Sequence, residues 1–264
     1  MKLVHEFAQH QLDAVLESFL EAGEQALREQ LLCVILHGSV VFGDLAPGYG
    51  DLDFLAVVAR DLSEHTCTRL TLLRRPFRAG EHGAFGTMLE GAFLPRHLLD
   101  PARTGRALWW GTSGERSWER NKLGLFAHEV IRNHGIVIWG EDLRGELPAA
   151  SRQDLLAEVH TNCLDIRRHG RGGGLHSVDW LLTAARLLLW LKEGRLSSKS
   201  DAAEWAHAHA AGPWREHLPR AKQIRLSPQL AEPADAQLWL SALTEPIQQA
   251  CDEVQQELRT IGGT

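Results

Sequence analysis

The chain has 264 residues, of which 44% are hydrophobic and 23% are charged, and its formal net charge is −6. This length and apolar content suit one large or two small globular domains. The acidic balance argues against a nucleic-acid-binding surface, which is normally basic, and it fits a small cationic partner.

Nothing in the chain predicts a membrane or secreted protein. No apolar run approaches the ~20 residues that span a bilayer, and Met1-Lys2-Leu3 leads directly into an amphipathic helix with acidic residues, unlike a signal peptide. The four cysteines form no CxxC pair, and the fourteen histidines show no HExxH spacing. We therefore expect no structural zinc, no disulfide framework, no membrane partner and a cytoplasmic location.

The first part of the chain alternates helices and strands. Apolar positions at helical spacing predict a helix over residues 6–30, and the run Leu31–His37 predicts a strand. Further along, we expect a strand at 51–58, a helix at 62–75, a strand at 84–95, a helix at 122–134 and a strand at 136–139. This order predicts an α/β (α+β) domain with a mixed sheet over residues 1–150.

The pattern changes near residue 148, where Pro148-Ala-Ala-Ser151 is typical of a linker that ends in a helix cap, followed by Asp154 in the first turn. Only helices are expected beyond this point: at 155–168, at 177–193 with Gly194 as its stop, at 201–211 with Ser200 as its cap, and at 234–260. The sequence therefore predicts an all-α helical bundle domain over residues 151–264, with a ligand cleft between the two domains.

Two carboxylates stand at the start of the strand expected at 51–58. Residues i and i+2 of a strand point to the same side, so Asp51 and Asp53 should share one face. Like charges held together need a counter-charge, and carboxylate oxygens suit Mg²⁺. The preceding Gly38-Ser39 turn offers backbone N–H groups that can cradle phosphate. These features indicate chemistry on a nucleoside triphosphate, although a plain polar turn between buried strands would also contain Asp.

A third acid, Glu90, interrupts the apolar segment at 84–95. Burying a charged side chain in a strand is costly unless the charge is paired or bound to a metal. Two-metal phosphoryl transfer needs a further acid, either as a metal ligand or as a general base. The alternative is an edge-strand glutamate that faces water, because the flanking Gly86 and Gly91 weaken the strand.

Gly38-Ser39 followed by Asp51-x-Asp53 resembles the signature of the polymerase-β-like nucleotidyltransferases. The resemblance implies transfer of a nucleoside monophosphate to a hydroxyl with two Mg²⁺ ions, and it implies that Glu90 is the base. The chain departs from the usual pattern at Gly50, where those enzymes have a serine, and its loop is slightly longer. Neither departure removes a metal ligand.

A second segment, LLTAARLLLWLKEGRLSSKSDAAEW at 181–205, resembles the C-terminal helical domain of the aminoglycoside 3''-adenylyltransferases. The matching residues are Arg186, Gly194, Lys199 and Glu204-Trp205. An arginine in an apolar helix needs an anionic partner or a path to solvent, and a helix N-terminus favours anions. The resemblance implies that Arg186 and Lys199 bind the triphosphate. Without it, Arg186 would pair with a structural acid and Lys199 would be solvated.

For the acceptor, relatives that act on streptomycin use a tryptophan between the domains and an aspartate on the arginine-bearing helix. A rough alignment places Ser113 and His176 at those positions. Candidate acceptor-binding residues are therefore His176 and Asp179 from the helix, with the ring of Trp109, Trp110 or Trp118, and with Glu129 or Asp165 as further acids. Most tryptophans fill cores, so each ring is also a candidate core residue.

The sequence thus predicts Mg²⁺-dependent transfer of AMP from ATP to a hydroxyl of a streptomycin- or spectinomycin-like aminoglycoside or aminocyclitol, with release of pyrophosphate, by a monomer. One alternative keeps the chemistry but uses a protein or another metabolite hydroxyl as acceptor. A second alternative is a non-catalytic module that binds ATP.

Overall fold

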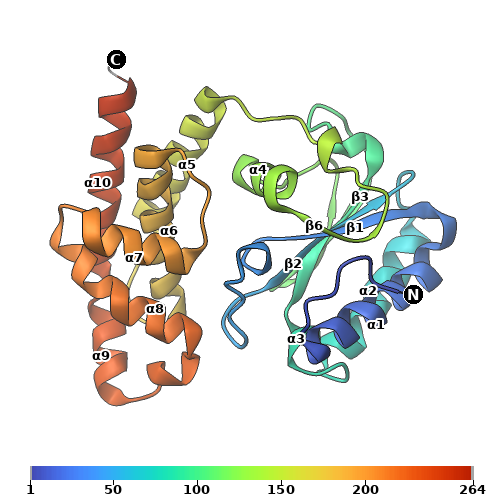
Figure 1. The fold of residues 1–264 in the computed structure, drawn as a ribbon, viewed down its shortest axis with the longest axis horizontal. Helices are drawn as coiled ribbons and strands as arrows, with labels where there is room; N and C mark the ends of the chain where they lie inside the picture. The colour runs from blue at the N-terminus through green and yellow to red at the C-terminus, as the bar shows by residue number, and fades with distance from the viewer. Residues whose placement is uncertain (1, 263–264) are drawn as a thin grey trace. The chain divides into compact units, whose positions relative to one another are not determined.

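The computed structural model describes residues 2–262 and divides the chain into two compact units, Met1–Ala150 and Ser151–Thr264 (Figure 1). The division falls at the Pro148–Ser151 stretch. No helix in the described range is long and apolar enough to cross a membrane.

The first unit is built on a six-stranded mixed sheet with the order β5-β4-β3-β2-β1-β6. Its strands are β1 (Leu31–His37), β2 (Leu52–Val58), β3 (Leu89–Pro95), β4 (Ala107–Gly111), β5 (Gly114–Trp118) and β6 (Ile136–Gly140). β2 and β3 run parallel, whereas the other neighbouring pairs are antiparallel. A parallel pair needs a crossover connection, and helices α2 (Glu64–Arg78) and α3 (Ala84–Thr87) supply it.

Helices cover both faces of this sheet. α1 (His10–Leu27) and α2 pack on one face, and α4 (Leu125–His134) packs on the other (Figure 1). Alternation along the strands therefore sorts side chains between two cores: in β2, Leu52, Phe54, Ala56 and Val58 face α1 and α2, whereas Leu55 and Val57 face the α4 side. The mixed sheet and the fold class predicted for this part of the chain are confirmed.

Two parts of the first unit differ from the sequence prediction. Residues 84–87 form the short helix α3 rather than the start of a strand, because Phe85 and Met88 bury their side chains at a helical spacing of three residues. The hairpin of β4 and β5 was not predicted. Its loop is the dipeptide Thr112-Ser113, set between Gly111 and Gly114.

The second unit is helical over its described residues. Its α-helices are α5 (Arg152–His169), α6 (Leu175–Glu193), α7 (Lys199–His209), α8 (Leu218–Leu226), α9 (Ala234–Ala242) and α10 (Thr244–Gly262). The predicted cap at Ser151 is confirmed by its side chain, which accepts a hydrogen bond from the Asp154 amide. Gly194 ends α6 in the left-handed conformation at φ 67°, as expected for a helix stop.

Two predictions for this unit are wrong in detail. Ser198, not Ser200, caps α7, because only Ser198 lies three residues before Asp201, whose amide it accepts at 3.0 Å. The helix predicted at 234–260 is two helices that meet at Leu243. Pro246 lacks the amide hydrogen that an uninterrupted helix would need there, and it is tolerated in the first turn of α10.

Candidate active site

The predicted acids of the first unit gather where β1 ends and β2 and β3 begin. In the sheet register, Asp53 is paired with His37 on one side and with Glu90 on the other. All three belong to the face of the sheet that α4 covers, because their neighbours at i±2, such as Ile35, Leu55 and Ala92, pack there. The strand order thus places Asp53 and Glu90 side by side although 36 other residues separate them in the chain.

Gly38 lies directly against the carboxylate of Asp53. A Cβ atom added to Gly38 would lie 2.0 Å from Asp53 Oδ2, and the Gly38 backbone is left-handed at φ 69°. Both observations restrict this position to glycine. Ser39 follows at the start of the short 3₁₀ turn Val40–Phe42, and its carbonyl accepts a hydrogen bond from the Asp44 amide at 3.0 Å. The Gly38-Ser39 turn is therefore in contact with Asp53.

Asp51 is exposed and stands immediately before β2, two residues from the half-buried Asp53. The chemistry of these donors fits a divalent cation, because carboxylate oxygens are the ligands that Mg²⁺ prefers. Within residues 2–262, however, no three His, Cys, Asp or Glu side chains are grouped closely enough to hold a metal ion. The structure therefore pairs Asp53 with Glu90 but does not assemble the full predicted set of three ligands.

Glu90 is half-buried, and a hairpin loop holds its carboxylate. Thr112 Oγ1 donates a hydrogen bond to Glu90 Oε2 at 2.7 Å. The alternative of an edge strand is excluded, because β3 lies inside the sheet between β2 and β4.

His37 is the buried histidine of this region. Its side chain is 5% exposed, and burial lowers the pKa of its imidazole to about 4. Among the described residues, its Nε2 atom has no hydrogen-bond partner. Burial also lowers the pKa of His128 on α4, which interacts electrostatically with His37. Both imidazoles are therefore neutral at pH 7.

The tryptophans suggested for the acceptor have different positions. Trp110 is fully buried among Phe19, Phe54 and Phe93, so the structure argues against its use as an acceptor-binding ring. Trp109 is half-buried on the opposite face and stacks on Trp118 with ring centroids 4.8 Å apart.

In the second unit, three of the predicted residues lie together near the start of α6 and α7. Lys199 Nζ donates to Asp179 Oδ1 at 2.5 Å, and His176 Nδ1 lies 3.9 Å from Asp179 Oδ2. Lys199 is therefore ion-paired rather than simply solvated. Arg186 is half-buried on α6, between fully buried neighbours.

Comparison with known proteins finds a matching family model and a similar solved structure. Residues 149–257 match the family model described as aminoglycoside adenylyltransferase, C-terminal domain. The fold resembles a solved structure of spectinomycin adenyltransferase AAD(9) from Enterococcus faecialis with ATP and spectinomycin. That match has a TM-score of 0.71 and 16% sequence identity, and it covers 91% of this chain and 98% of the other. No curated protein sequence matches the chain.

Residues 149–257 thus match the C-terminal domain of the aminoglycoside adenylyltransferases, and the chain shares its fold with AAD(9). The family match covers the second unit, which carries Arg186 and Lys199, and the structural match extends the shared fold over the first unit. The resemblance expected from the segment at 181–205 is confirmed by the family match, and for the first unit the shared fold is confirmed.

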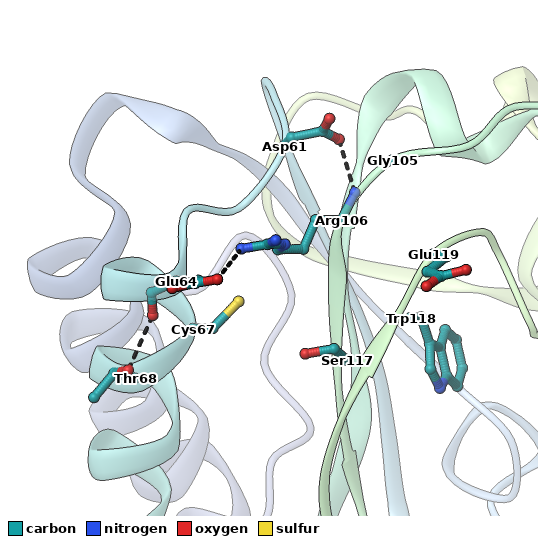
Figure 2. A pocket seen from close by; sticks show the side chains of 9 residues that line it. All are labelled: Asp61, Glu64, Cys67, Thr68, Gly105, Arg106, Ser117, Trp118 and Glu119. Atoms are coloured by element: carbon teal, nitrogen blue, oxygen red, sulfur yellow. Dashed lines mark hydrogen bonds and ion pairs between the residues drawn. The ribbon is translucent and has the colours of Figure 1, made fainter.

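The first unit also has a pocket of about 770 Å³ away from these acids, between α2 and the edge strand β5 (Figure 2). Arg106 reaches across it toward Glu64 at 3.4 Å, while its backbone amide donates to Asp61. Gly38, Ser39, Asp51, Asp53 and Glu90 all lie outside its lining.

Sequence reasoning missed Thr112, which touches the candidate base. The signal was present: Gly-Thr-Ser-Gly between two strand-like runs is typical of a two-residue hairpin loop.

Proposed function

We propose that this nucleotidyltransferase transfers AMP from ATP to a hydroxyl of an aminoglycoside or aminocyclitol antibiotic, with release of pyrophosphate. The observation that carries the proposal is the contact of Gly38 with Asp53 beside Glu90, because it joins a phosphate-binding turn to paired acids. The family match of residues 149–257 and the solved relative with ATP and spectinomycin support the choice of nucleotide and acceptor class.

Each residue has a role that follows from its chemistry. Asp51, Asp53 and Glu90 are not grouped closely enough in this structure to hold an ion together, so they would have to move together to hold Mg²⁺, which would supply charge neutralisation at the transferring phosphoryl group. The Gly38-Ser39 turn would bind phosphate oxygens through backbone amides. Glu90 accepts the proton of the acceptor hydroxyl, and that oxygen attacks the α-phosphorus in line with the departing pyrophosphate.

In the second unit, Arg186 and Lys199 are the proposed phosphate-binding cations. Asp179 and His176 are the proposed acceptor-binding residues there, and the stacked Trp109 and Trp118 are the remaining candidate rings in the first unit. An acidic residue such as Asp179 suits a cationic aminosugar. Because Lys199 and Asp179 are paired with each other, ligand binding would replace one ion pair by contacts to phosphate and to amine.

The direct test is to incubate the protein with ATP, Mg²⁺ and a panel that includes spectinomycin and streptomycin. Mass spectrometry should find one member of the panel heavier by one adenylyl group. If every antibiotic is unchanged while pyrophosphate still forms with a protein or another metabolite, the acceptor is of that second kind. The departures from the streptomycin-type pattern at Ser113 and His176 keep this alternative open.

A further inference from the structure

The loop of the β4–β5 hairpin is placed against the candidate base. Thr112, the first of its two loop residues, donates its hydroxyl to Glu90 Oε2 at 2.7 Å. A glutamate side chain has three rotatable bonds, and a single hydrogen bond to one carboxylate oxygen selects one orientation of the group. The other oxygen, Oε1, is then presented in a defined direction.

A buried arginine on α2 sets the distance between this loop and the base. Arg74 Nη1 donates to the carbonyl of Gly111 at 2.9 Å, and Nη2 donates to the carbonyl of Leu89 at 3.2 Å. Gly111 immediately precedes Thr112, and Leu89 immediately precedes Glu90. One rigid guanidinium therefore fixes the backbone on both sides of the Thr112–Glu90 hydrogen bond.

The charge of Arg74 is compensated where it lies. Its side chain is 4% exposed and forms an ion pair with Glu115 of β5 at 3.2 Å. The guanidinium also lies 5.5 Å from the centre of the Trp110 ring. One turn later on α2, Arg78 donates to the Thr112 carbonyl at 3.3 Å. A buried charge of this kind is costly unless it is paired. The contacts that compensate the charge of Arg74 therefore also hold the hairpin in place.

We propose that Thr112 and Arg74 are positioning residues for Glu90. Thr112 orients the carboxylate through Oε2 and leaves Oε1 to accept the proton of the acceptor hydroxyl, while Arg74 holds the two backbones at the separation that this hydrogen bond requires. The inference rests on the proposed role of Glu90 as general base.

The test compares Thr112→Val, which keeps the shape and removes the hydroxyl, with Thr112→Ser, which keeps the hydroxyl. Loss of a hydrogen bond to a charged group should lower kcat for AMP transfer by about tenfold to a hundredfold, with KM for ATP and acceptor unchanged. Thr112→Ser should restore most of kcat. Thr161→Val, at an exposed threonine of α5, is the matched control and should leave kcat unchanged.

Arg74→Lys tests the second half of the proposal, and its first readout, amide hydrogen exchange, needs no substrate. Lysine keeps a positive charge but cannot bridge two carbonyls with a planar fork. Amide hydrogen exchange at 111–114 should become faster than in the wild type, and kcat should fall together with it. Unchanged exchange in a folded Arg74→Lys variant would show that Arg74 does not hold the loop.

Glu90→Gln separates this inference from the function on which it rests. If Glu90→Gln retains wild-type kcat, the role of Glu90 as base is wrong. If Glu90→Gln is inactive but Thr112→Val retains wild-type kcat, Glu90 is the base and the positioning role of Thr112 is wrong.

Discussion

Asp53 of β2 and Glu90 of β3 occupy paired positions on neighbouring parallel strands and face the same side of the sheet. Neighbouring strands lie about 4.8 Å apart, so side chains at paired positions on one face are close enough to act on the same bound group. Gly38 closes one side of Asp53, and Thr112 binds Glu90. This local arrangement underlies the proposed chemistry.

Gly38→Ala tests the contact between the Gly-Ser turn and Asp53. The new methyl group would overlap Asp53 Oδ2, so the carboxylate must move, and AMP transfer should fall by at least about a hundredfold, as 1 Å displacements of catalytic groups do. Gly43→Ala is the matched control, because Gly43 has nearly the same φ of 66° but nothing within 4 Å of its added Cβ.

Both variants should lose similar stability, about 1–2 kcal/mol, from the left-handed backbone alone. Thermal unfolding measures this loss of stability, and steady-state kinetics measures the loss of AMP transfer that the displacement of Asp53 causes. Equal activities of the two variants would mean that displacement of Asp53 has no consequence for catalysis.

Lys199→Met should raise KM for ATP by about tenfold to a hundredfold, because it removes a charge-assisted contact to phosphate. Its effect on folding should be below about 1 kcal/mol, since the ion pair with Asp179 is partly exposed. The double variant Asp179→Lys with Lys199→Asp restores an ion pair but not the position of the cation. If that double variant regains wild-type KM, Lys199 acts only through its structural pair.

Stability should decrease as the pH falls below neutrality, in part through His37. Its folded-state pKa of about 4 lies below the ordinary value of 6.5, so the unfolded chain binds a proton first. The neutral His37 side chain therefore contributes on the order of 3 kcal/mol to the free energy of unfolding above pH 6.5, and this contribution is lost as the pH falls toward 4.

Urea unfolding at several pH values measures how steeply the free energy of unfolding changes with pH. His37→Phe should flatten this dependence without abolishing it, because the pKa of His128 is lowered in the same direction. An unchanged slope in His37→Phe would assign the acid sensitivity to other groups.

The sequence predicted the elements that carry the candidate acids, because strong local signals mark them. The apolar runs before Gly38 and after Asp51 form β1 and β2. Ser151 caps the start of α5 and Gly194 ends α6, as expected. What local signals could not supply was strand order. Nothing near Asp53 or Glu90 in the chain states that β2 and β3 are parallel neighbours.

The same limit explains what the sequence could not predict around the site. The sequence around Trp110 is equally compatible with a ligand-binding ring and with a core residue. Its packing against Phe19 and Phe54 shows that it is a core residue. Thr112 and Arg74 act on Glu90 from 22 and 16 residues away in sequence. The pairing of Lys199 with Asp179 likewise depends on how α6 and α7 pack, which their individual sequences do not reveal.

The most direct test of the central claim is to titrate Mn²⁺ into the protein in the presence of a non-hydrolysable ATP analogue and to follow free Mn²⁺ by electron paramagnetic resonance. The wild type should bind Mn²⁺ tightly in this complex, Asp53→Asn and Asp51→Asn should lose that binding, and Glu119→Gln, at an exposed acid of the α2–β5 pocket, should retain it. Equal Mn²⁺ affinity in the wild type and Asp53→Asn, with nucleotide bound to both, would contradict the assignment of these acids as the metal-binding centre of an AMP transferase.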